Sequence, residues 1–424
     1  MVLLGSTAVA ADRPPVGPLK PLQGGHAPSL ATVLPLLDDA ALGGLVDASV
    51  LDAATGRVLL DRSASSMVIP ASPLKILTAA AALSVLGPGR RLSTRVLATA
   101  VPSAGVLKGD LVLVGGGDPT LSAGRDRRYP QPAALDDLAA RVAKAGIRSV
   151  TGRVVYDSSL FSGPALAEGW RGSYVLEGSV APVSSLAVDE GRSLVNPLQG
   201  ARSLSPAFDA ADSFVQALRR AGVQVNGAFA PGDAPAGAKV IATVSSAPVR
   251  NLVERMLTES DNDLAEALGR LVALETSQPA TFTGAASAVT DTLAKLGLPL
   301  PLGARLVDTS GLSREDRISP AYLASLVRLV SEPTHADLRA ALTGLPVAAA
   351  TGTLTKRFHG LAAAGAGVVR AKTGSLAGVS SLVGTAVTRG GRLLVFAVAA
   401  EAVPGRSAAE AALDRFAAGL ANLA

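Results

Sequence analysis

The pattern of apolar positions predicts one helix that lies wholly inside the protein. From Ile76 to Val85 almost every residue is apolar, and a helix that is apolar on all sides belongs in a core. Ser72 stands at a position typical of an N-cap, and Pro73 suits the first helical position, where its missing N–H is not needed. Residues 87–89, Gly-Pro-Gly, form a strong stop signal. The sequence therefore predicts a buried helix that starts at Ser72.

Strands and further helices are predicted on both sides of this helix. Apolar runs bounded by turn residues indicate strands, and longer stretches with apolar residues three and four apart indicate helices. The predicted strands are residues 45–50, 58–60, 95–100, 107–114, 149–156, 183–188, 239–244, 368–373, 380–387 and 393–399. The predicted helices are residues 29–37, 132–145, 214–221, 252–257, 264–271, 283–296, 320–330, 335–343 and 408–423.

This order of elements predicts an α+β protein with a leader and two domains. Residues 1–27 are rich in proline and glycine and are predicted as a leader and linker, in which residues 8–10, Ala-Val-Ala, resemble a signal-peptide cleavage site. Residues 28–95 and 246–424 are predicted to form one domain, and residues 96–245 an inserted α+β domain of short strands. No later segment has the length of a transmembrane helix. We expect a soluble, exported protein, with a membrane tether through the leader as an alternative.

Composition restricts the partners more than it restricts the fold. The chain has 424 residues, of which 48% are hydrophobic and 17% charged, and this suffices for a large core. The formal net charge is +5, but the basic residues are scattered and only 3% of the residues are aromatic. Such a chain lacks the stacking platform that single-stranded nucleic acid needs, so we expect no nucleic-acid partner.

The lack of cysteine and the scarcity of histidine restrict the chemistry. Without cysteine there is no disulfide, no thiolate metal site and no cysteine nucleophile. The three histidines, His26, His335 and His359, do not stand at ligand spacing, so we expect no metal and no cofactor. A hydrolase that uses His359 as its base is a minor alternative, because a surface turn explains that residue equally well.

Ser72 and Lys75 form the first candidate motif. They are three residues apart, so their side chains lie near the same face of the first helical turn. A lysine that is desolvated beside the positive end of a helix has a lowered pKa and can activate a serine without histidine. The alternative is an N-cap serine followed by a lysine that reaches solvent.

The second candidate motif, Ser260-Asp261-Asn262, interrupts two predicted helices. Serine, aspartate and asparagine are all good N-caps, so a simple helix start is one explanation. In the functional explanation, Ser260 and Asn262 are two apart in a non-helical link and point to one side. Ser260 then relays a proton, and Asn262 donates to a substrate carbonyl.

The third candidate motif, Lys372-Thr373-Gly374-Ser375, ends a predicted strand. A charged strand end followed by a glycine turn is the structural explanation. The functional one is an edge strand against which an extended peptide lies, with Lys372 and Thr373 holding a carboxylate. Gly374 would let the ligand backbone approach, and the N–H groups of Ser375 and Ser72 would form an oxyanion hole.

The order S-x-x-K, S-D-N, K-T-G is far more specific than any one motif, because class A β-lactamases and penicillin-binding proteins share this set. The sequence resembles the D-alanyl-D-alanine carboxypeptidase/endopeptidase family, the class C low-molecular-mass penicillin-binding proteins of peptidase family S13. The resemblance extends from residue 45 to residue 424. Its further segments are residues 113–121, 156–161, 256–266, 308–313, 352–354 and 369–376.

The resemblance implies a penicillin-binding transpeptidase/β-lactamase-like domain, an antiparallel five-stranded sheet flanked by helices, with a β-rich inserted domain. Family members often carry a third domain nested in that insertion, and we expect it to be missing or vestigial between Asp189 and Asp212. The resemblance also implies that Ser72 is acylated with Lys75 as its general base.

For the other two motifs, the resemblance implies that Ser260 passes a proton to the leaving group and that Asn262 positions the acyl peptide. Lys372 and Thr373 take the terminal carboxylate. The expected activity is that of a serine D-Ala-D-Ala carboxypeptidase of the cell-wall space, which acts on peptidoglycan stem peptides and is trapped by β-lactams; D,D-endopeptidase activity is left open.

Two alternatives share the fold. A β-lactamase would need a base for deacylation, and the sequence offers no clear extra carboxylate motif between Ser72 and Lys372. A non-catalytic scaffold that binds the cell wall would keep the fold without the chemistry, and the intact motifs argue against it.

Overall fold

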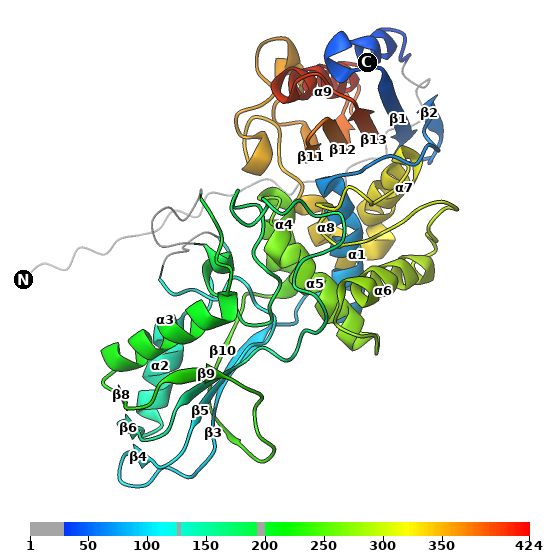
Figure 1. Cartoon of the computed structure of the whole chain (residues 1–424). Coiled ribbons are helices and arrows are strands. Elements are labelled where there is room, and N and C mark those ends of the chain that lie inside the picture. The colour runs from blue at the N-terminus through cyan, green and yellow to red at the C-terminus, as the bar shows by residue number, and fades with distance from the viewer. Residues whose placement is uncertain (1–28, 125–128, 193–199) are drawn as a thin grey trace, which may run out of the picture.

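The computed structural model describes residues 29–124, 129–192 and 200–424. Figure 1 shows two sheet-containing units at opposite ends of the molecule, with a group of helices between them. The predicted leader, its cleavage site and His26 lie outside the described residues. Among the described residues, no helix is long and apolar enough to cross a membrane.

The first sheet is antiparallel throughout, with the order β11-β12-β13-β1-β2. Its strands alternate between two cores, as a pleated strand must: along β13, Phe396 and Val398 face one apolar cluster, whereas Val395 and Ala397 face the other. This sheet confirms the predicted α+β fold class. The strands are β1 (Leu45–Asp52), β2 (Val58–Arg62), β11 (Val369–Leu376), β12 (Val379–Val387) and β13 (Leu393–Glu401).

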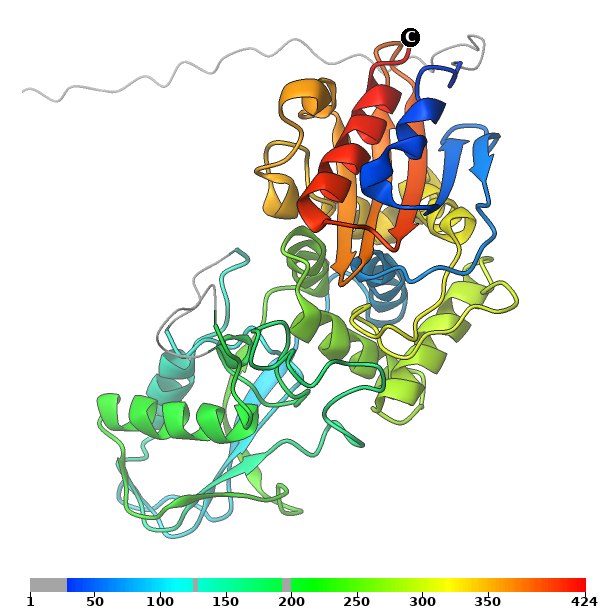
Figure 2. The same ribbon diagram turned by 45° about the horizontal axis from the view of Figure 1, so that its top comes forward.

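Helices cover both faces of this sheet. The C-terminal helix α9 (Arg406–Ala421) packs on one face, beside the short 3₁₀ helices η1 (Leu34–Asp38) and η2 (Ala40–Leu42), and Figure 2 shows these segments side by side. Helix α7 (Pro320–Ser331) lies against the other face. β11 is an edge strand, and on its outer side an isolated antiparallel bridge joins Arg370, near its start, to Val347.

The helices between the sheets surround α1 (Lys75–Leu86), which is the predicted buried helix. Nearly all of its residues are inaccessible to solvent, because α1 contacts helices on several sides. Its neighbours include α4 (Val249–Thr258), α5 (Asn262–Glu275), α6 (Phe282–Lys295) and α8 (Arg339–Thr343).

The second sheet lies within the predicted insertion and is mixed, with the order β10-β3-β5-β7-β9. Its first and last strands in the sequence, β3 and β10, pair with each other from Ser93 opposite Ser245, so the chain enters and leaves at the same place. The domain boundaries at residues 96 and 245 stay a prediction. The strands are β3 (Ser93–Ala98), β5 (Leu111–Val114), β7 (Val154–Asp157), β9 (Phe229–Pro231) and β10 (Lys239–Ser245).

Helices α2 (Leu135–Lys144) and α3 (Pro206–Arg220) share one apolar core with this second sheet. A small parallel sheet, β4-β6-β8, lies at its end. Its strands are β4 (Val106–Leu107), β6 (Ser149–Val150) and β8 (Gln224–Val225). The expected vestige of a third domain falls partly on residues 193–199, which lie outside the described residues.

Several local predictions were wrong. The predicted strands 107–114 and 149–156 are each divided into two strands that belong to different sheets, and the predicted helix 29–37 is a 3₁₀ helix that begins at Leu34. Residues 183–188 form no strand. Ser72 is not the N-cap of the buried helix: it is the first residue of a 3₁₀ turn, η3 (Ser72–Leu74), whose N-cap is Ala71, and α1 begins only at Lys75. No side chain caps this turn, because its N-cap residue is an alanine, and the hydroxyl of Ser72 accepts from Lys75.

Candidate active site

The backbone before Ser72 adopts an unusual conformation. Ala71 has φ 53° and ψ −147°, a region that residues other than glycine rarely occupy. The neighbours Ala71, Pro73 and Leu74 are buried, whereas Ser72 is partly exposed. The turn therefore presents one hydroxyl at the surface of an otherwise apolar segment.

Lys75 is completely buried, and its ammonium group is surrounded by three acceptors. Nζ donates to the Oγ of Ser72 at 3.2 Å, to the Oδ1 of Asn262 at 2.6 Å and to the carbonyl oxygen of Ser310 at 2.6 Å. Three acceptors match the three donors of a protonated lysine. The structure thus brings the first and second motifs together at this nitrogen.

The surroundings of Lys75 lower its pKa into the range that a general base needs. Burial lowers the pKa of Lys75 to about 8, although the carboxylates of Asp308, Glu266, Asp261 and Asp263 oppose this shift. At pH 7 roughly one molecule in ten then holds the neutral amine. The hydroxyl of Ser72 lies within hydrogen-bonding reach of this base.

The second motif has its cap at Asp261 rather than at either neighbour. The side chain of Asp261 accepts from the N–H of Leu264 at 3.0 Å, and Asn262 is the first residue of α5. Ser260 has φ 59° and is partly exposed, and its side chain makes no hydrogen bond within the part of the chain that the structure describes. The amide nitrogen of Asn262 donates to the carbonyl oxygen of Ser179, at 2.8 Å, in the insertion. Asn262 is thereby fixed from both sides.

The third motif lies on the edge strand β11. Lys372 is completely buried, and its Nζ donates to the carbonyl oxygen of Thr373 at 3.0 Å. Burial, and secondarily the charge of Lys75, hold the pKa of Lys372 well below its usual value. The hydroxyl of Thr373 is hydrogen-bonded to that of Thr353 at 2.9 Å. The three motifs therefore meet between α1, α5 and β11.

Gly374 and Ser375 connect the edge strand to its surroundings. A Cβ at Gly374 would lie 2.1 Å from the Oγ of Ser381 and 2.5 Å from the Cδ of Pro73, so glycine is needed for β11 to pack against the turn that carries Ser72. This reason is independent of the ligand contact that the sequence suggested. The hydroxyl of Ser375 donates to Glu410 of α9 at 3.1 Å.

Asp308 organises the site, although none of the three motifs contains it. It is completely buried and accepts from the backbone N–H groups of Ser310, Gly311 and Ser313 at 3.0, 2.6 and 2.7 Å. Trp170 of the insertion donates its indole N–H to the same carboxylate at 2.7 Å. Asp308 thus fixes the turn in which the carbonyl oxygen of Ser310 accepts a hydrogen bond from Lys75. Its only sequence signal was the D-T-S-G-L-S segment of the family resemblance.

A buried network of charges joins the insertion to the second motif. Glu190 of the insertion is paired with Arg255 and, at 3.6 Å, with Arg202, which also lies 3.3 Å from Asp263. Burial, and then the neighbouring Glu190, raise the pKa of Asp261 to about 8, and Asp261 shares a hydrogen bond with Glu190. Within the described ranges, these three carboxylates are the group close enough to hold a metal ion. Arg192, Arg202 and Arg255 lie among these groups, so the arrangement fits an ion-pair network.

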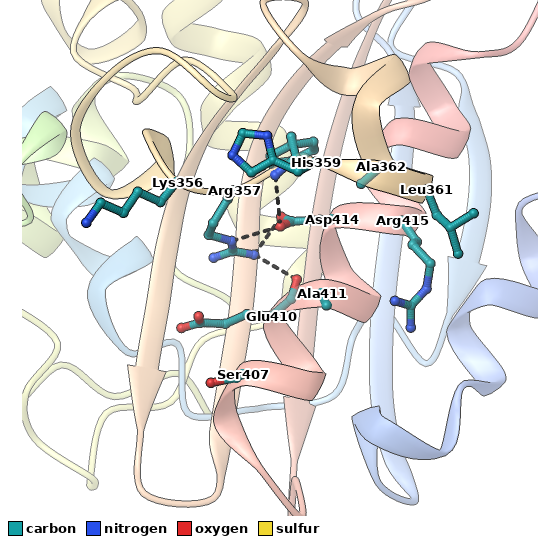
Figure 3. A pocket seen from close by; sticks show the side chains of 11 residues that line it. Lys356, Arg357, His359, Leu361, Ala362, Ser407, Glu410, Ala411, Asp414 and Arg415 are labelled. Carbon is teal, nitrogen blue, oxygen red and sulfur yellow. Dashed lines mark hydrogen bonds and ion pairs between the residues drawn. The ribbon is translucent and has the colours of Figure 1, made fainter.

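The pocket near His359 does not contain a histidine-dependent catalytic site. A cavity of about 440 Å³ lies between α9 and residues 356–362, and Figure 3 shows His359 and Asp414 in its wall. The carboxylate of Asp414 binds the guanidinium of Arg357 at 2.7 and 3.0 Å, so it does not orient the imidazole. In the described part of the chain the imidazole of His359 has no hydrogen-bond partner, and the residue is exposed.

Comparisons with known proteins find similarity to carboxypeptidases. The sequence matches the D-Ala-D-Ala carboxypeptidase 3 (S13) family over residues 30–201 and 196–421. It is 40% identical over 375 residues to carboxypeptidase Rv3627c of Mycobacterium tuberculosis, with 87% of this chain and 79% of that protein covered. It is 31% identical over 425 residues to the D-alanyl-D-alanine carboxypeptidase of Actinomadura sp., with 82% and 76% covered.

A solved structure shares the fold. The crystal structure of penicillin binding protein 4 from Haemophilus influenzae superposes with a TM-score of 0.79 at 22% identity, with 91% of this chain and 97% of that chain covered. The same protein in complex with a β-lactam superposes with a TM-score of 0.73 at 21% identity, with the same shares covered.

Proposed function

We propose a mechanism for this chain from the premise that it belongs to the D-Ala-D-Ala carboxypeptidase 3 (S13) family and is a serine-type D-Ala-D-Ala carboxypeptidase. The observation that carries the mechanism is the contact between Lys75 Nζ and Ser72 Oγ at 3.2 Å, at the point where the second and third motifs converge. The lowered pKa of Lys75 supports its role as the base.

In the acylation step, Ser72 Oγ attacks the carbonyl carbon between the last two D-alanines of a peptidoglycan stem peptide, and Lys75 Nζ takes the hydroxyl proton. The N–H groups of Ser72 and Ser375 stabilise the oxyanion. The C–N bond then breaks, and Ser260 gives its hydroxyl proton to the amine of the departing D-alanine while it receives the proton held by Lys75. In deacylation, water attacks the ester carbon and gives a proton to Lys75; the ester C–O bond breaks, and Lys75 passes that proton to Ser72.

Binding is assigned to the remaining motif residues. Lys372 and Thr373 hold the terminal carboxylate of the substrate beside the free edge of β11, where Gly374 keeps the strand close to Ser72. Asn262 positions the acyl peptide; one of its two amide N–H groups is used by Ser179, and the other is available for a substrate carbonyl. No step requires a metal or a cofactor.

β-Lactams acylate the same serine in this proposal, in keeping with the β-lactam complex of the Haemophilus protein, whose fold this chain shares. Because peptidoglycan lies outside the cytoplasm, we propose that the protein acts in the periplasmic or cell-wall space. A β-lactamase-type hydrolase and a non-catalytic scaffold are the competing functions.

Intact mass spectrometry after incubation with benzylpenicillin tests the proposal. We expect a persistent adduct on the wild-type protein and none on Ser72→Ala. Rapid loss of the drug without an adduct would favour the β-lactamase. A folded wild-type protein that neither forms an adduct nor consumes the drug would favour the scaffold. Release of D-alanine from a D-Ala-D-Ala peptide then measures carboxypeptidase activity. Cleavage of cross-linked peptide dimers, assayed in parallel, measures endopeptidase activity.

A further inference from the structure

Glu266 is a buried carboxyl group in the site for which the mechanism above has no role. It stands on α5 one helical turn after Asn262, so both side chains lie on the same face of the helix. Its side chain is completely inaccessible to solvent. A buried carboxyl group is unfavourable unless it is paired and hydrogen-bonded, so its partners show what it is for.

The partners of Glu266 belong to the turn that holds Lys75. Oε1 accepts from the backbone N–H of Thr309 at 3.2 Å, and Oε2 accepts from the hydroxyl of Thr309 at 3.0 Å. The carbonyl of Thr309 accepts from Thr78 at 2.6 Å, and the next carbonyl, that of Ser310, accepts from Lys75 at 2.6 Å. The turn is thus held between Glu266 on α5 and two residues on one face of α1.

Arg270 fixes Glu266 from the other side. Its Nη1 lies 3.7 Å from the Oε2 of Glu266, and its guanidinium carbon lies 4.0 Å from the ring centre of Phe282. Arg270 also donates to the carbonyl oxygen of Pro164 at 3.3 Å and is almost completely buried. Because Arg270 is fixed in this way, the carboxyl group of Glu266 cannot turn away from Thr309 without losing its ion pair.

The charge of Glu266 is linked to that of Lys75. Burial, and secondarily Asp308, raise the pKa of Glu266 to about 7, while Arg270 opposes this shift. When ionised, Glu266 raises the pKa of Lys75. The other charged groups that face Lys75 are Asp308 from the turn, Asp261 and Asp263 from the start of α5, and Lys372 from β11.

We propose that Glu266 is a positioning residue of the reaction: through Thr309 it fixes the turn whose Ser310 carbonyl binds Lys75, and its buried negative charge stabilises the ammonium form of that lysine. The inference rests on the proposed function, in which Lys75 is the general base. Glu266 acts through Thr309 and Lys75 and does not touch the substrate, so it is distinct from the deacylation base of a β-lactamase.

Two substitutions separate the two parts of this role. Glu266→Gln keeps an acceptor for Thr309 but removes the charge. Thr309→Val keeps the charge but removes the hydroxyl, which lies 3.0 Å from both the Oε2 of Glu266 and the carbonyl oxygen of Ala265. The measurement is the rate constant of acylation by benzylpenicillin from acid through neutral to mildly alkaline pH, with the thermal midpoint of unfolding recorded for each protein.

With Glu266→Gln, Lys75 loses a stabilising negative charge, so the pH at which acylation is half-maximal should move to a lower value. The maximal rate constant should change by less than about tenfold, because the amide still accepts a hydrogen bond. With Thr309→Val the maximal rate constant should fall, and the half-maximal pH should stay where it is in the wild type.

An unchanged half-maximal pH in Glu266→Gln, with only a lower thermal midpoint, would reduce Glu266 to a structural residue and overturn the inference. If Glu266→Gln does not fold, Glu266→Asp replaces it: the charge is kept and the reach shortened, so the half-maximal pH should hold while the maximal rate falls. A shifted half-maximal pH in Glu266→Asp would equally contradict the inference. A wild-type protein that forms no adduct at any pH would instead refute the proposed function.

Discussion

Lys75 and Lys372 are equally buried, yet they stand in opposite electrostatic surroundings. Neither has any exposed surface. Lys75 faces four carboxylates and three hydrogen-bond acceptors, and its pKa falls to about 8. The charged neighbour of Lys372 is Lys75, and the pKa of Lys372 falls well below its usual value. Burial therefore lowers the pKa of both lysines. Around Lys75 the carboxylates oppose that shift, whereas at Lys372 the charge of Lys75 adds to it.

Replacing Lys75 should have the largest effect on the chemistry. In Lys75→Met the base is lost, so the rate constant of acylation by benzylpenicillin should fall by about 10²–10⁴-fold. The carbonyl of Ser310 and the amide oxygen of Asn262 lose a buried donor, so the unfolding free energy should also fall, by about 1–3 kcal/mol for each group. Mass spectrometry and thermal melting measure the two effects.

The exposed Lys295 on α6 provides the matched control. Lys295→Met should leave both the acylation rate constant and the thermal midpoint close to the wild type. Acylation of Lys75→Met at the wild-type rate would show that another group takes the proton from Ser72.

Replacing Lys372 should change stability in the opposite direction. Lys372→Met removes a buried amine that has no carboxylate partner among the described residues, so the unfolding free energy should rise by about 1 kcal/mol. Acylation should slow by about 10–100-fold, because a charge-assisted contact with the ligand carboxylate is lost. Benzylpenicillin and its methyl ester, which lacks that carboxylate, separate binding from chemistry. The wild type should prefer the acid and Lys372→Met should not; an unchanged preference would place the carboxylate elsewhere.

Lys372 should also take up a proton when a carboxylate binds. Burial lowers the pKa of Lys372 in the free protein, and an adjacent carboxylate favours the charged form. Affinity should therefore fall as the pH rises, by at most about tenfold per pH unit. Calorimetry of a D-Ala-D-Ala peptide binding to Ser72→Ala, in two buffers of different ionisation enthalpy, measures the uptake. Uptake should vanish when Lys372→Met is added; its persistence would assign the proton to another group.

The sequence predicted the residues of each motif but not the contacts between the motifs. The apolar patterns of the first sheet, α1 and α9 are strong local signals, and the structure contains the elements that they predict. The N-cap assignment of Ser72 was wrong because its hydroxyl is used by Lys75 rather than by the backbone. The roles of Asp308, Glu266 and Ser179 were missed because each depends on contacts between distant parts of the chain. The contact of Lys75 with Ser310, for example, joins residues 235 positions apart, and no local pattern encodes such a separation.

The smallest predicted effect concerns the support of β11 by α9. Glu410 accepts from the hydroxyl of Ser375 at 3.1 Å and from the Nε of Arg406 at 2.9 Å, and Figure 3 shows it beside the pocket on α9. Partial burial alone would raise the pKa of Glu410, but the hydrogen bond from Arg406 and the charges of Arg357 and Arg406 lower it overall. Glu410 is therefore ionised at neutral pH. Glu410→Gln keeps an acceptor for Ser375, so acylation should slow only about two- to threefold.

The slower acylation in Glu410→Gln should not depend on pH, and this distinguishes the surroundings of β11 from those of Lys75. Around Lys75 the groups titrate near neutrality, so a charge removed there should move the pH profile. Ser375 has no ionisable proton in that range, and Glu410 stays ionised throughout it, so Glu410→Gln should lower the acylation rate constant by one constant factor. Glu332→Gln, on the partly exposed ion pair with Arg328, is the control and should change nothing. A shift of the half-maximal pH in Glu410→Gln would show that the charge of Glu410, beside β11, affects the titration of the groups around Lys75.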